Sequence, residues 1–442
     1  MFLVKEKAIL FILTALVLVG CEQNFNQSTN QNSQVATTTT NNNVAPTDTG
    51  ANTTNARNAG MPVTMPLIDA MFSDEAFSQE AKTAVQLSDE EITKIQDAAR
   101  NAVLQLSGDA SDDDVRSTRA SVDKTRQQIE KIIGPERTKK FFDLIRNRWG
   151  GEDPDGITAQ PNAVPTDTRI VVNAPAYRMD VFRDGQLVKT YKVGIGYPEF
   201  PLPTGLRKAN EIIFNPTWTP PDEPWVKGKV QPGQKVEAGS KLNPLGPIKI
   251  PIGLPSLVHG GKDPSRLGTF ASHGCVGLTS AGIQDFAREL SALSGDEFTP
   301  QEIKDYEKQK TETKNVKLAQ PVPVELRYET IVVENGKVTV YRDVYERGTN
   351  NEENLRNVLQ VYGVTLESLS EQERTALMDA LEKMAVDARG EKVEEPANTD
   401  KNSNKNNSAK VTRSIKGEKS VTVEVAALRG KGYPAPVNLV EK

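Results

Sequence analysis

The residue types that can carry covalent chemistry in this 442-residue chain gather between residues 259 and 275. The chain has two histidines, His259 and His273, and both lie in this segment together with Cys275. The only other cysteine, Cys21, lies near the N-terminus. A free cysteine is commonly an inert packing residue, but such a thiol needs no imidazole beside it. Two rare histidines around one thiol therefore favour a reaction centre.

In the first interpretation Cys275 is a nucleophile. An imidazole takes the thiol proton, and the thiolate attacks a carbonyl to form a thioester. His259 lies sixteen residues upstream and is followed by two glycines, so it can return across a loop to face Cys275. His273 is two residues from Cys275 and would be its neighbour on a strand. Gly274 leaves backbone N–H groups open towards a substrate, as stabilisation of an oxyanion requires.

Two other interpretations remain open on residue types alone. His259, His273 and Cys275 could bind a zinc ion, with water or Asp263 as the fourth ligand. The sequence contains no second cysteine pair and no HExxH-like helix to support this site. The segment could also be an inert part of the core.

The pattern around this segment is that of a β domain. From about residue 168, short runs of β-branched and aromatic residues alternate with polar ones. Asp184-Gly185 predicts a two-residue hairpin turn between residues 179–181 and 187–191. After the cysteine, one helix is predicted to pack on the sheet through Ile283, Phe286, Ala287 and Leu290.

The β pattern continues towards the C-terminus. Residues 322–348 read as a second hairpin around Asn335-Gly336, and we expect this hairpin to complete the sheet. The resulting mainly-β domain covers residues 168–348. Residues 391–410 are predicted to be a linker, and residues 411–442 to hold a strand from Ser420 to Ala426 and a tail.

Helical patterns flank the β domain on both sides. Residues 67–150 show a 3.6-residue apolar period, with a capping box at Ser88 and Glu91. Residues 350–390 return to helix, with a second capping box at Ser370 and Glu373. The predicted fold is thus mainly β, with a helical N-terminal module and helical C-terminal additions.

The N-terminus resembles the leader of a bacterial lipoprotein. Lys5 and Lys7 precede an apolar run, Ala8 to Val19, that is shorter than a membrane-spanning helix needs. The residues 18–21, LVGC, resemble the lipobox, in which the cysteine is lipidated. We therefore expect a signal peptide at residues 1–20 and a lipidated Cys21; an ordinary export signal or an uncleaved anchor is the alternative.

The segment after Cys21 predicts how the folded part is attached. Residues 21–66 are polar and lack periodicity, which is typical of a disordered tether. Glu22 is not the aspartate that, by resemblance to enterobacterial lipoproteins, retains a lipoprotein in the inner membrane. We expect an outer-membrane anchor and a position in the periplasm. The net charge of -5 gives no indication of a nucleic-acid partner.

Several motifs together resemble a known family. VHG at residues 258–260, followed by SHGCVGL at 272–278, resembles the active-site signature of the L,D-transpeptidase catalytic domain (YkuD-like). PTG at residues 203–205 and NPTW at 215–218 resemble two further elements of that domain. The resemblance extends from residue 168 to about 345.

This resemblance implies a β-sandwich-like enzyme that needs no cofactor and no metal and acts on peptidoglycan stem peptides. Its thiolate attacks the third residue of a donor tetrapeptide, releases D-alanine and passes the acyl group to an acceptor amine. By motif match Cys275 is the nucleophile, and His259 is the base, oriented by the Gly260 carbonyl. The residues that shape the pocket and the oxyanion region are Ser272, His273 and Gly274.

One position departs from the family pattern. Gly277 stands where the family commonly has arginine or asparagine, and the arginine is thought to help hold the donor. Arg266 or Lys262, in the loop between the histidines, could supply a cation instead. Solvated loop charges are the competing explanation.

The expected function is that of a lipid-anchored L,D-transpeptidase. The same residues would serve an L,D-carboxypeptidase, in which water replaces the acceptor amine. A non-catalytic peptidoglycan-binding lipoprotein is the alternative from another class, and the presence of Cys275 with both histidines argues against it.

Overall fold

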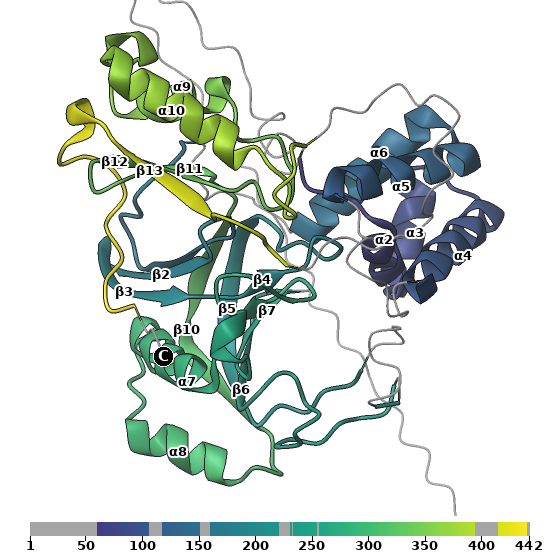
Figure 1. Cartoon of the computed structure of the whole chain (residues 1–442). Helices are drawn as coiled ribbons and strands as arrows, with labels where there is room; N and C mark the ends of the chain where they lie inside the picture. The colour runs from purple at the N-terminus through teal and green to yellow at the C-terminus, as the bar shows by residue number, and fades with distance from the viewer. Residues whose placement is uncertain are drawn as a thin grey trace, which may run out of the picture. The chain divides into compact units, whose positions relative to one another are not determined.

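The computed structural model describes residues 60–105, 117–150, 160–220, 230–231, 233–253, 256–393 and 414–439 (Figure 1). The predicted signal peptide, Cys21 and most of the predicted tether and linker lie outside these ranges. Across the ranges that are described, no helix combines the length and the apolar character that crossing a membrane requires.

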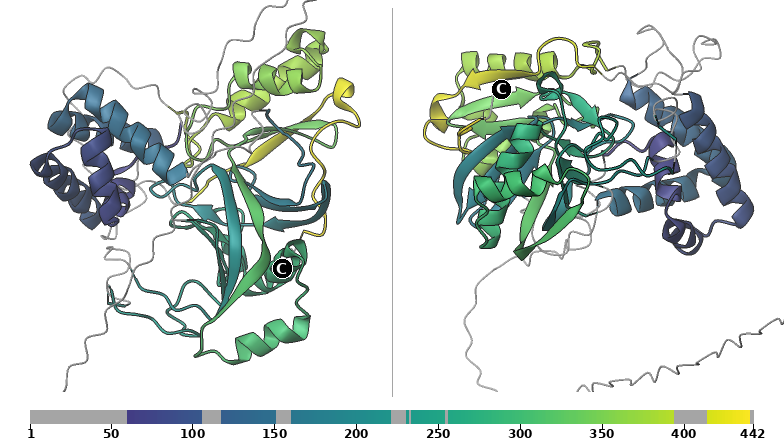
Figure 2. Two further views of the ribbon diagram at one scale, coloured as in Figure 1. Left: turned by 180° about the vertical axis from the view of Figure 1, so that it is seen from behind. Right: turned by 90° about the horizontal axis from the view of Figure 1, so that it is seen from below.

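An eight-stranded sheet organises the described part of the chain from residue 169 to residue 327, in the order β3-β2-β1-β10-β5-β6-β7-β9. Its strands are β1 (Arg169–Asn173), β2 (Arg178–Arg183), β3 (Gln186–Lys192), β5 (Gly205–Phe214), β6 (Ile248–Pro251), β7 (Leu257–His259), β9 (Val276–Gly277) and β10 (Lys314–Arg327). The long strands β5 and β10 run side by side and antiparallel through its centre (Figure 2). A pair of short strands, β4 (Ile195–Gly196) and β8 (Phe270–Ser272), lies apart from this sheet. The mainly-β prediction is confirmed.

The predicted hairpin and helix around the sheet are present. Asp184 and Gly185 both have positive φ angles, 50° and 77°, and join β2 to β3 as the sequence predicts. Helix α7 (Ser280–Ser294) buries the four predicted apolar residues, and Phe286 packs edge-on against Tyr191. Helix α8 (Pro300–Lys308), which the sequence analysis did not anticipate, begins at a capping box of Thr299 and Glu302.

The N-terminal module consists of helices, as predicted: α2 (Met65–Phe72), α3 (Glu75–Ala84), α4 (Asp89–Gln105), α5 (Thr118–Ile133) and α6 (Pro135–Gly150). At the start of α4 the Ser88 hydroxyl accepts from the Glu91 backbone N–H, while the Glu91 carboxylate accepts from the Ser88 N–H. Gly134, at φ 78°, separates α5 from α6. The helices enclose an apolar core of their own, in which the rings of Phe72, Phe77 and Phe141 pack together.

The prediction that the second hairpin completes the large sheet is wrong. Its strands, β11 (Ile331–Glu334) and β12 (Lys337–Tyr341), instead join β13 (Ser420–Glu424) in a separate three-stranded sheet. Helices α9 (Glu352–Val361) and α10 (Glu371–Met384) pack on this sheet (Figure 1). The cause is burial: the inward residues of β11 and β12 share an apolar core with both helices.

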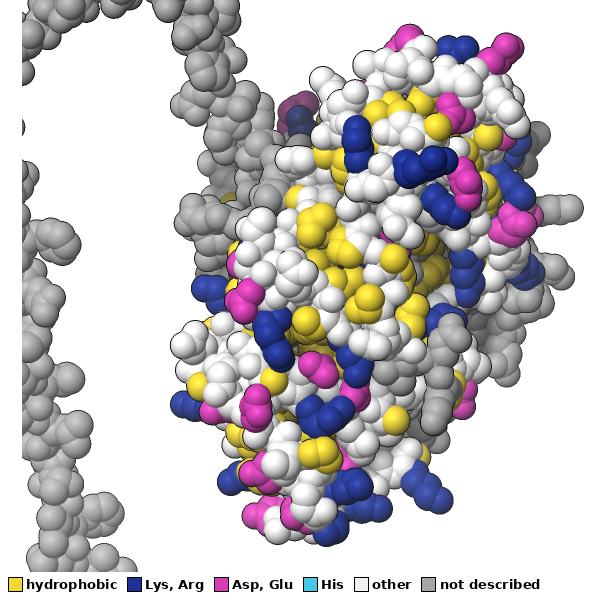
Figure 3. Space-filling model, turned by 90° about the vertical axis from the view of Figure 1, so that its left-hand side faces the viewer, with side chains coloured by type: hydrophobic (Ala, Val, Ile, Leu, Met, Phe, Trp, Pro, Cys, Tyr) yellow, Lys and Arg dark blue, Asp and Glu magenta, His cyan; other side chains and the backbone are white. Residues whose placement is uncertain are grey.

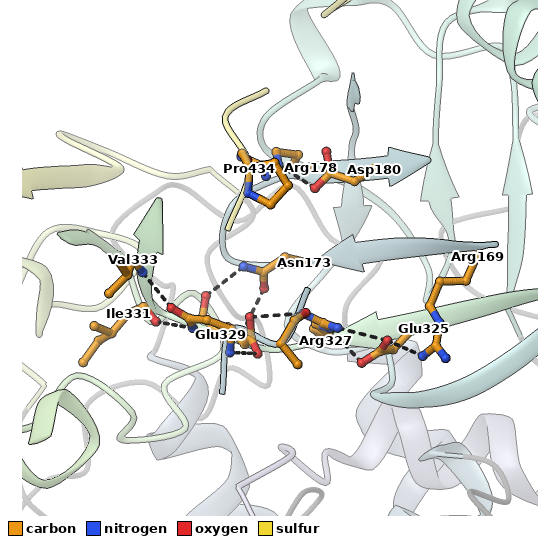
Figure 4. A network of polar contacts seen from close by, with 12 residues as sticks. Arg169, Asn173, Arg178, Asp180, Glu325, Arg327, Glu329, Ile331, Val333 and Pro434 are labelled. Atoms are coloured by element: carbon orange, nitrogen blue, oxygen red, sulfur yellow. Dashed lines mark hydrogen bonds and ion pairs between the residues drawn. The ribbon is translucent and has the colours of Figure 1, made fainter. Parts of the chain in front are cut away.

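The large sheet also carries a network of buried ion pairs, drawn in Figure 4. Glu325 of β10 is only 1% exposed and accepts from Arg327 at 2.7 Å and from Arg169 at 2.9 Å. Because the buried carboxylate has two guanidinium partners, its charge is compensated inside the protein.

The network continues towards the three-stranded sheet. Arg178 of β2 donates to Asp180 and to Glu334 of β11, at 2.7 Å in both cases, and to the Pro434 carbonyl at 3.2 Å. The guanidinium groups of Arg178 and Arg327 lie 5.1 Å and 5.9 Å from the ring centre of Tyr433. Charged groups thus connect the eight-stranded sheet to the three-stranded sheet.

The surface shown in Figure 3 has no single charge character. Among the residues drawn in colour, Lys and Arg side chains are interspersed with Asp and Glu side chains, with apolar side chains visible between them. This distribution agrees with the small net charge of the chain.

Candidate active site

Strand β7 carries His259 into the interior, where the residue is 3% exposed. The ring Nδ1 lies 2.9 Å from the carbonyl oxygen of the next residue, Gly260. With a proton on Nδ1 donated to that carbonyl, Nε2 is the acceptor nitrogen of the neutral ring. Gly260 lies so close to Ile283 of α7 that an added Cβ would come within 2.5 Å of its Cγ2, so the backbone carbonyl is held in place by packing.

The register of two parallel strands brings Cys275 to the histidine strand. Val258 is aligned with Val276 and His259 with Gly277, so Cys275 immediately precedes the paired part of β9. A hydrogen bond from the Leu257 backbone favours the thiolate form of Cys275. The chain therefore folds back between His259 and Cys275, which are sixteen positions apart, as the nucleophile interpretation requires.

Ser272 fixes the turn that presents Cys275. Its hydroxyl donates to the Cys275 carbonyl at 2.5 Å and accepts from the Cys275 N–H at 3.1 Å. Gly274, inside this turn, has φ 87°, which a residue with a side chain rarely adopts. The Gly274 carbonyl accepts from the buried Ser256 hydroxyl at 2.8 Å.

Trp149, at the end of α6, closes the space beside Gly274. A Cβ atom at Gly274 would lie 2.9 Å from Cζ2 of the indole. The indole Nε1–H donates to the Pro201 carbonyl at 2.8 Å, and the Trp149 carbonyl accepts from Arg207 at 2.6 Å. A residue outside the β domain thus contacts the active-site turn.

The imidazole of His273 lies among aromatic rings. The ring centres of Tyr197 and Phe200 are each 5.0 Å from the imidazole, in edge-on orientations. Arg266 donates to the Tyr197 hydroxyl at 2.9 Å and to the Phe270 carbonyl at 2.6 Å. Arg266 is therefore engaged within the loop that holds His273.

Lys262 lies over Gly277, the position that departs from the family pattern. A Cβ atom at Gly277 would be 2.8 Å from Cγ and 2.9 Å from Cε of the lysine. The Lys262 backbone N–H donates to the Leu278 carbonyl at 3.0 Å, and the Leu278 N–H donates to the His259 carbonyl at 2.8 Å. Of the two loop cations that the sequence offered, Lys262 is the one beside Gly277.

Burial controls the charge of these groups. The pKa of His259 is lowered from 6.5 to about 3, mainly by burial and also by the Lys262 charge, although the Gly260 and Leu245 carbonyls act in the opposite direction. The imidazole is therefore neutral at pH 7 and can accept a proton. Burial raises the pKa of the Cys275 thiol, which the Leu257 N–H and Lys262 partly counteract. Burial also lowers the pKa of Lys262 to about 8.

The donor atoms of the zinc alternative do not converge. Within the described ranges, no group of three or more His, Cys, Asp or Glu side chains is arranged to hold a metal ion. Asp263, the fourth ligand in that interpretation, caps the short helix η2 (Pro264–Arg266) by accepting from the Ser265 N–H at 2.9 Å and from its hydroxyl at 2.6 Å. The Asp263 carboxylate is thus hydrogen-bonded within its own turn.

Comparison with protein families decides the identity of the β domain. Residues 167–318 match the L,D-transpeptidase catalytic domain (YkuD). These residues belong to the L,D-transpeptidase catalytic domain family. The match runs from β1 through β9 and ends at residue 318, inside β10, so it includes the turns that carry His259 and Cys275.

Solved structures of L,D-transpeptidases are similar to this chain at low identity. The catalytic domain of the Enterococcus faecium enzyme is 15% identical, over 37% of this chain and 99% of that one, with a TM-score of 0.24. The same domain acylated by ertapenem is 18% identical over 28% of this chain and 88% of that one, with a TM-score of 0.22. The Mycobacterium smegmatis enzyme is 17% identical over 36% of this chain and 58% of that one, again with a TM-score of 0.22. None of the curated proteins matches the chain.

The match indicates that residues 167–318 form a catalytic domain of the L,D-transpeptidase type. Sequence reasoning did not find four residues that hold its site: Trp149, Tyr197, Phe200 and Ser256. An isolated serine carries no local signal. The aromatic residues fit ordinary core positions, and only the tertiary structure places them beside the turn.

Proposed function

We propose that this chain is a periplasmic, lipid-anchored L,D-transpeptidase that forms peptidoglycan cross-links through a thioester on Cys275. The observation that supports it best is the orientation of His259, whose Nδ1 is held by the Gly260 carbonyl on the strand beside the cysteine. A neutral imidazole fixed in this way presents Nε2 as a proton acceptor.

In the first step the thiol loses its proton to Nε2 of His259. The sulfur attacks the carbonyl carbon of the third residue of a donor tetrapeptide, and an S–C bond forms. The C–N bond to the terminal D-alanine then breaks, and His259 returns the proton to the leaving amine. The turn of Ser272, His273 and Gly274 is proposed to line the oxyanion region during this step.

In the second step an acceptor amine attacks the thioester. A new C–N bond forms, the S–C bond breaks, and the amine proton passes through His259 to the cysteine sulfur. If water entered in place of the amine, the same residues would release a tripeptide, which is the carboxypeptidase reaction. Whether the reaction is transpeptidation or carboxypeptidation therefore depends on whether an acceptor amine or water reaches the thioester.

The lipid anchor is proposed at Cys21, with an outer-membrane location. The tether of about 40 residues would have a root-mean-square reach of roughly 35 Å. Such a reach would allow the catalytic domain to work on peptidoglycan at a distance from the membrane.

The function is tested by incubating the purified protein with disaccharide-tetrapeptide and analysing the products by mass spectrometry. We expect a cross-linked dimer with loss of one alanine, and none with Cys275→Ala. Tripeptide without dimer would indicate a carboxypeptidase.

A carbapenem provides an independent test of the nucleophile. We expect one acyl adduct, located on the peptide that contains Cys275. Absence of both product and adduct would identify a non-catalytic peptidoglycan-binding protein instead.

A further inference from the structure

The space above Gly277 is filled by a lysine from another segment. Lys262 comes from the loop after β7, and its aliphatic chain runs over the glycine at 2.8–2.9 Å from the position of an added Cβ. Only glycine leaves this room, so the lysine side chain and the absence of a side chain at 277 are complementary. The loop holds the lysine by its backbone, through Lys262 N–H to Leu278 O at 3.0 Å.

Lys262 acts electrostatically on both proposed reacting residues. Its charge favours the thiolate of Cys275 and disfavours protonation of His259. Among the described residues, the charged groups that act on the half-buried ammonium of Lys262 are Cys275 and Arg266, and no carboxylate is among them. Asp263, its neighbour in sequence, is bonded to Ser265.

We propose that Lys262 is the cation of this active site, placed over Gly277 so that its ammonium stabilises the Cys275 thiolate. The proposal deepens the proposed function, because it assigns an electrostatic role at the same site. Gly277 of β9 stands where the family commonly has arginine or asparagine. In this proposal the positive charge comes from the loop after β7 and not from β9.

The electrostatic role covers both halves of the first step. When the S–H bond breaks, the proton moves to Nε2 of His259 and the negative charge stays on sulfur, opposite the ammonium. Lys262 keeps its own proton throughout. The same ammonium repels the imidazolium, which favours transfer of the proton from His259 to the leaving amine. Attraction to the sulfur thus favours formation of the thiolate, whereas repulsion of the imidazolium opposes its formation and assists only the later transfer of the proton to the leaving amine.

The charge state of Lys262 depends on its surroundings. Burial lowers its pKa to about 8, the thiolate of Cys275 raises it, and the guanidinium of Arg266 lowers it. At neutral pH the lysine is therefore mostly protonated. Above about pH 8 the ammonium, and with it the stabilisation of the thiolate, is lost.

The experiment measures the alkylation rate of Cys275 by iodoacetamide between pH 5 and pH 10, in the full-length protein. Peptide mass spectrometry quantifies the Cys275 peptide alone, so that Cys21 does not contribute. The variants are Lys262→Met, Lys262→Arg and, as a matched control, Lys208→Met, which removes an exposed lysine from β5. This readout requires no peptidoglycan substrate.

We expect Lys262→Met to slow alkylation at pH 7 by roughly tenfold, as a rise of about one unit in the pKa of the thiol would. Lys262→Arg should restore most of the rate, and Lys208→Met should leave the profile unchanged. A Lys262→Met protein that is folded by circular dichroism and alkylates with the wild-type pH profile overturns the proposal. If that variant does not fold, Lys262→Gln is measured in its place, against the same criterion.

The outcome is separable from that of the proposed function. A protein that makes no product from disaccharide-tetrapeptide but loses thiol reactivity in Lys262→Met would keep this proposal and reject the transpeptidase. If the protein forms the dimer but the alkylation rate of Cys275 is unchanged in Lys262→Met, the transpeptidase function is kept and this proposal is rejected.

Discussion

Two regions of the molecule bury charged groups, and they treat them in opposite ways. In the ion network of the large sheet, burial alone would lower the pKa of Arg178 and Arg327, but the adjacent carboxylates more than offset it and raise both. At the active site, burial lowers the pKa of Lys262 to about 8 and that of His259 to about 3. The network holds full charges, whereas at the site burial favours the neutral forms of the His259 imidazole and the Cys275 thiol.

The number of charged partners distinguishes the buried groups that are structural from those that are proposed to react. Glu325 has two guanidinium partners, which compensate its buried charge. Cys275, His259 and Lys262 have only backbone groups and one another as compensation among the described residues. Incomplete compensation costs stability and leaves burial as the dominant influence, which raises the pKa of Cys275, lowers that of His259 to about 3 and brings that of Lys262, at about 8, close to neutral pH.

The largest expected effect is on activity. His259→Gln should reduce the rate of dimer formation by about 10³-fold, because the proton acceptor for the thiol is lost. The midpoint of thermal unfolding at pH 7 should change little, since the neutral amide can still donate to the Gly260 carbonyl. A mass-spectrometric time course and a melting curve test both statements. A large loss of stability with retained turnover would show that His259 is a structural residue and not a reactive one.

Acid should destabilise the folded site through the same histidine. The pKa of His259 is about 3 in the folded state and 6.5 in an unfolded chain, so between these values the unfolded chain binds more protons. Stability is therefore lost as pH falls from 6.5 towards 3, by about 3–5 kcal/mol in total. Urea unfolding of the wild type and His259→Gln at pH 7 and pH 4 measures the difference, and equal losses in both proteins would contradict it.

In the ion network the expected effect is on stability. Glu325→Gln should lower the free energy of unfolding by about 3 kcal/mol, because two guanidinium groups lose a charged partner. Turnover per folded molecule should be unchanged. The control is Glu424→Gln, which breaks an exposed ion pair with Lys337 and should leave the unfolding midpoint where it is. Loss of turnover in folded Glu325→Gln would show that the regions are coupled.

The smallest effect is expected at Lys262. Its pKa is about 8 in the folded state and 10.5 in an unfolded chain, so stability rises with pH between these values and the full cost of the buried charge is present below pH 8. Lys262→Met should thus be more stable by about 1 kcal/mol at pH 7, given the partial exposure of the lysine, and the gain should vanish towards pH 10.5. Denaturation curves at pH 7 and pH 10 test this prediction; a gain that is the same at both pH values would show that packing, and not charge, is its cause.

Local chemistry made much of the fold predictable. The capping boxes at Ser88 and Ser370 mark real helix starts, because each motif satisfies backbone groups within four residues. Asp184-Gly185 and Asn335-Gly336 form their turns, since both pairs tolerate positive φ angles. In all these cases the information lies within a few residues.

The sequence could not show which strands pair with each other or which distant side chains pack together. β12 carries a correct strand pattern but pairs with β13, because alternation specifies the buried face and not the sheet that covers it. At the site, the segment of His259 and Cys275 was recognisable from rare residue types. The approach of Lys262 to Gly277 and of Trp149 to Gly274 depends on tertiary packing that no local pattern encodes.

The pairing of β12 with β13 sets an order of events in folding. The strand at residues 337–341 is complete long before its neighbour at residues 420–424 has been synthesised, and closing so long a connection is entropically costly. During that interval the hydrogen-bonding edge of β12 lacks its partner and can pair with other chains. The three-stranded sheet therefore becomes safe from aggregation late in synthesis, and substitutions in β13 should reduce the yield of folded protein before they affect any catalytic step.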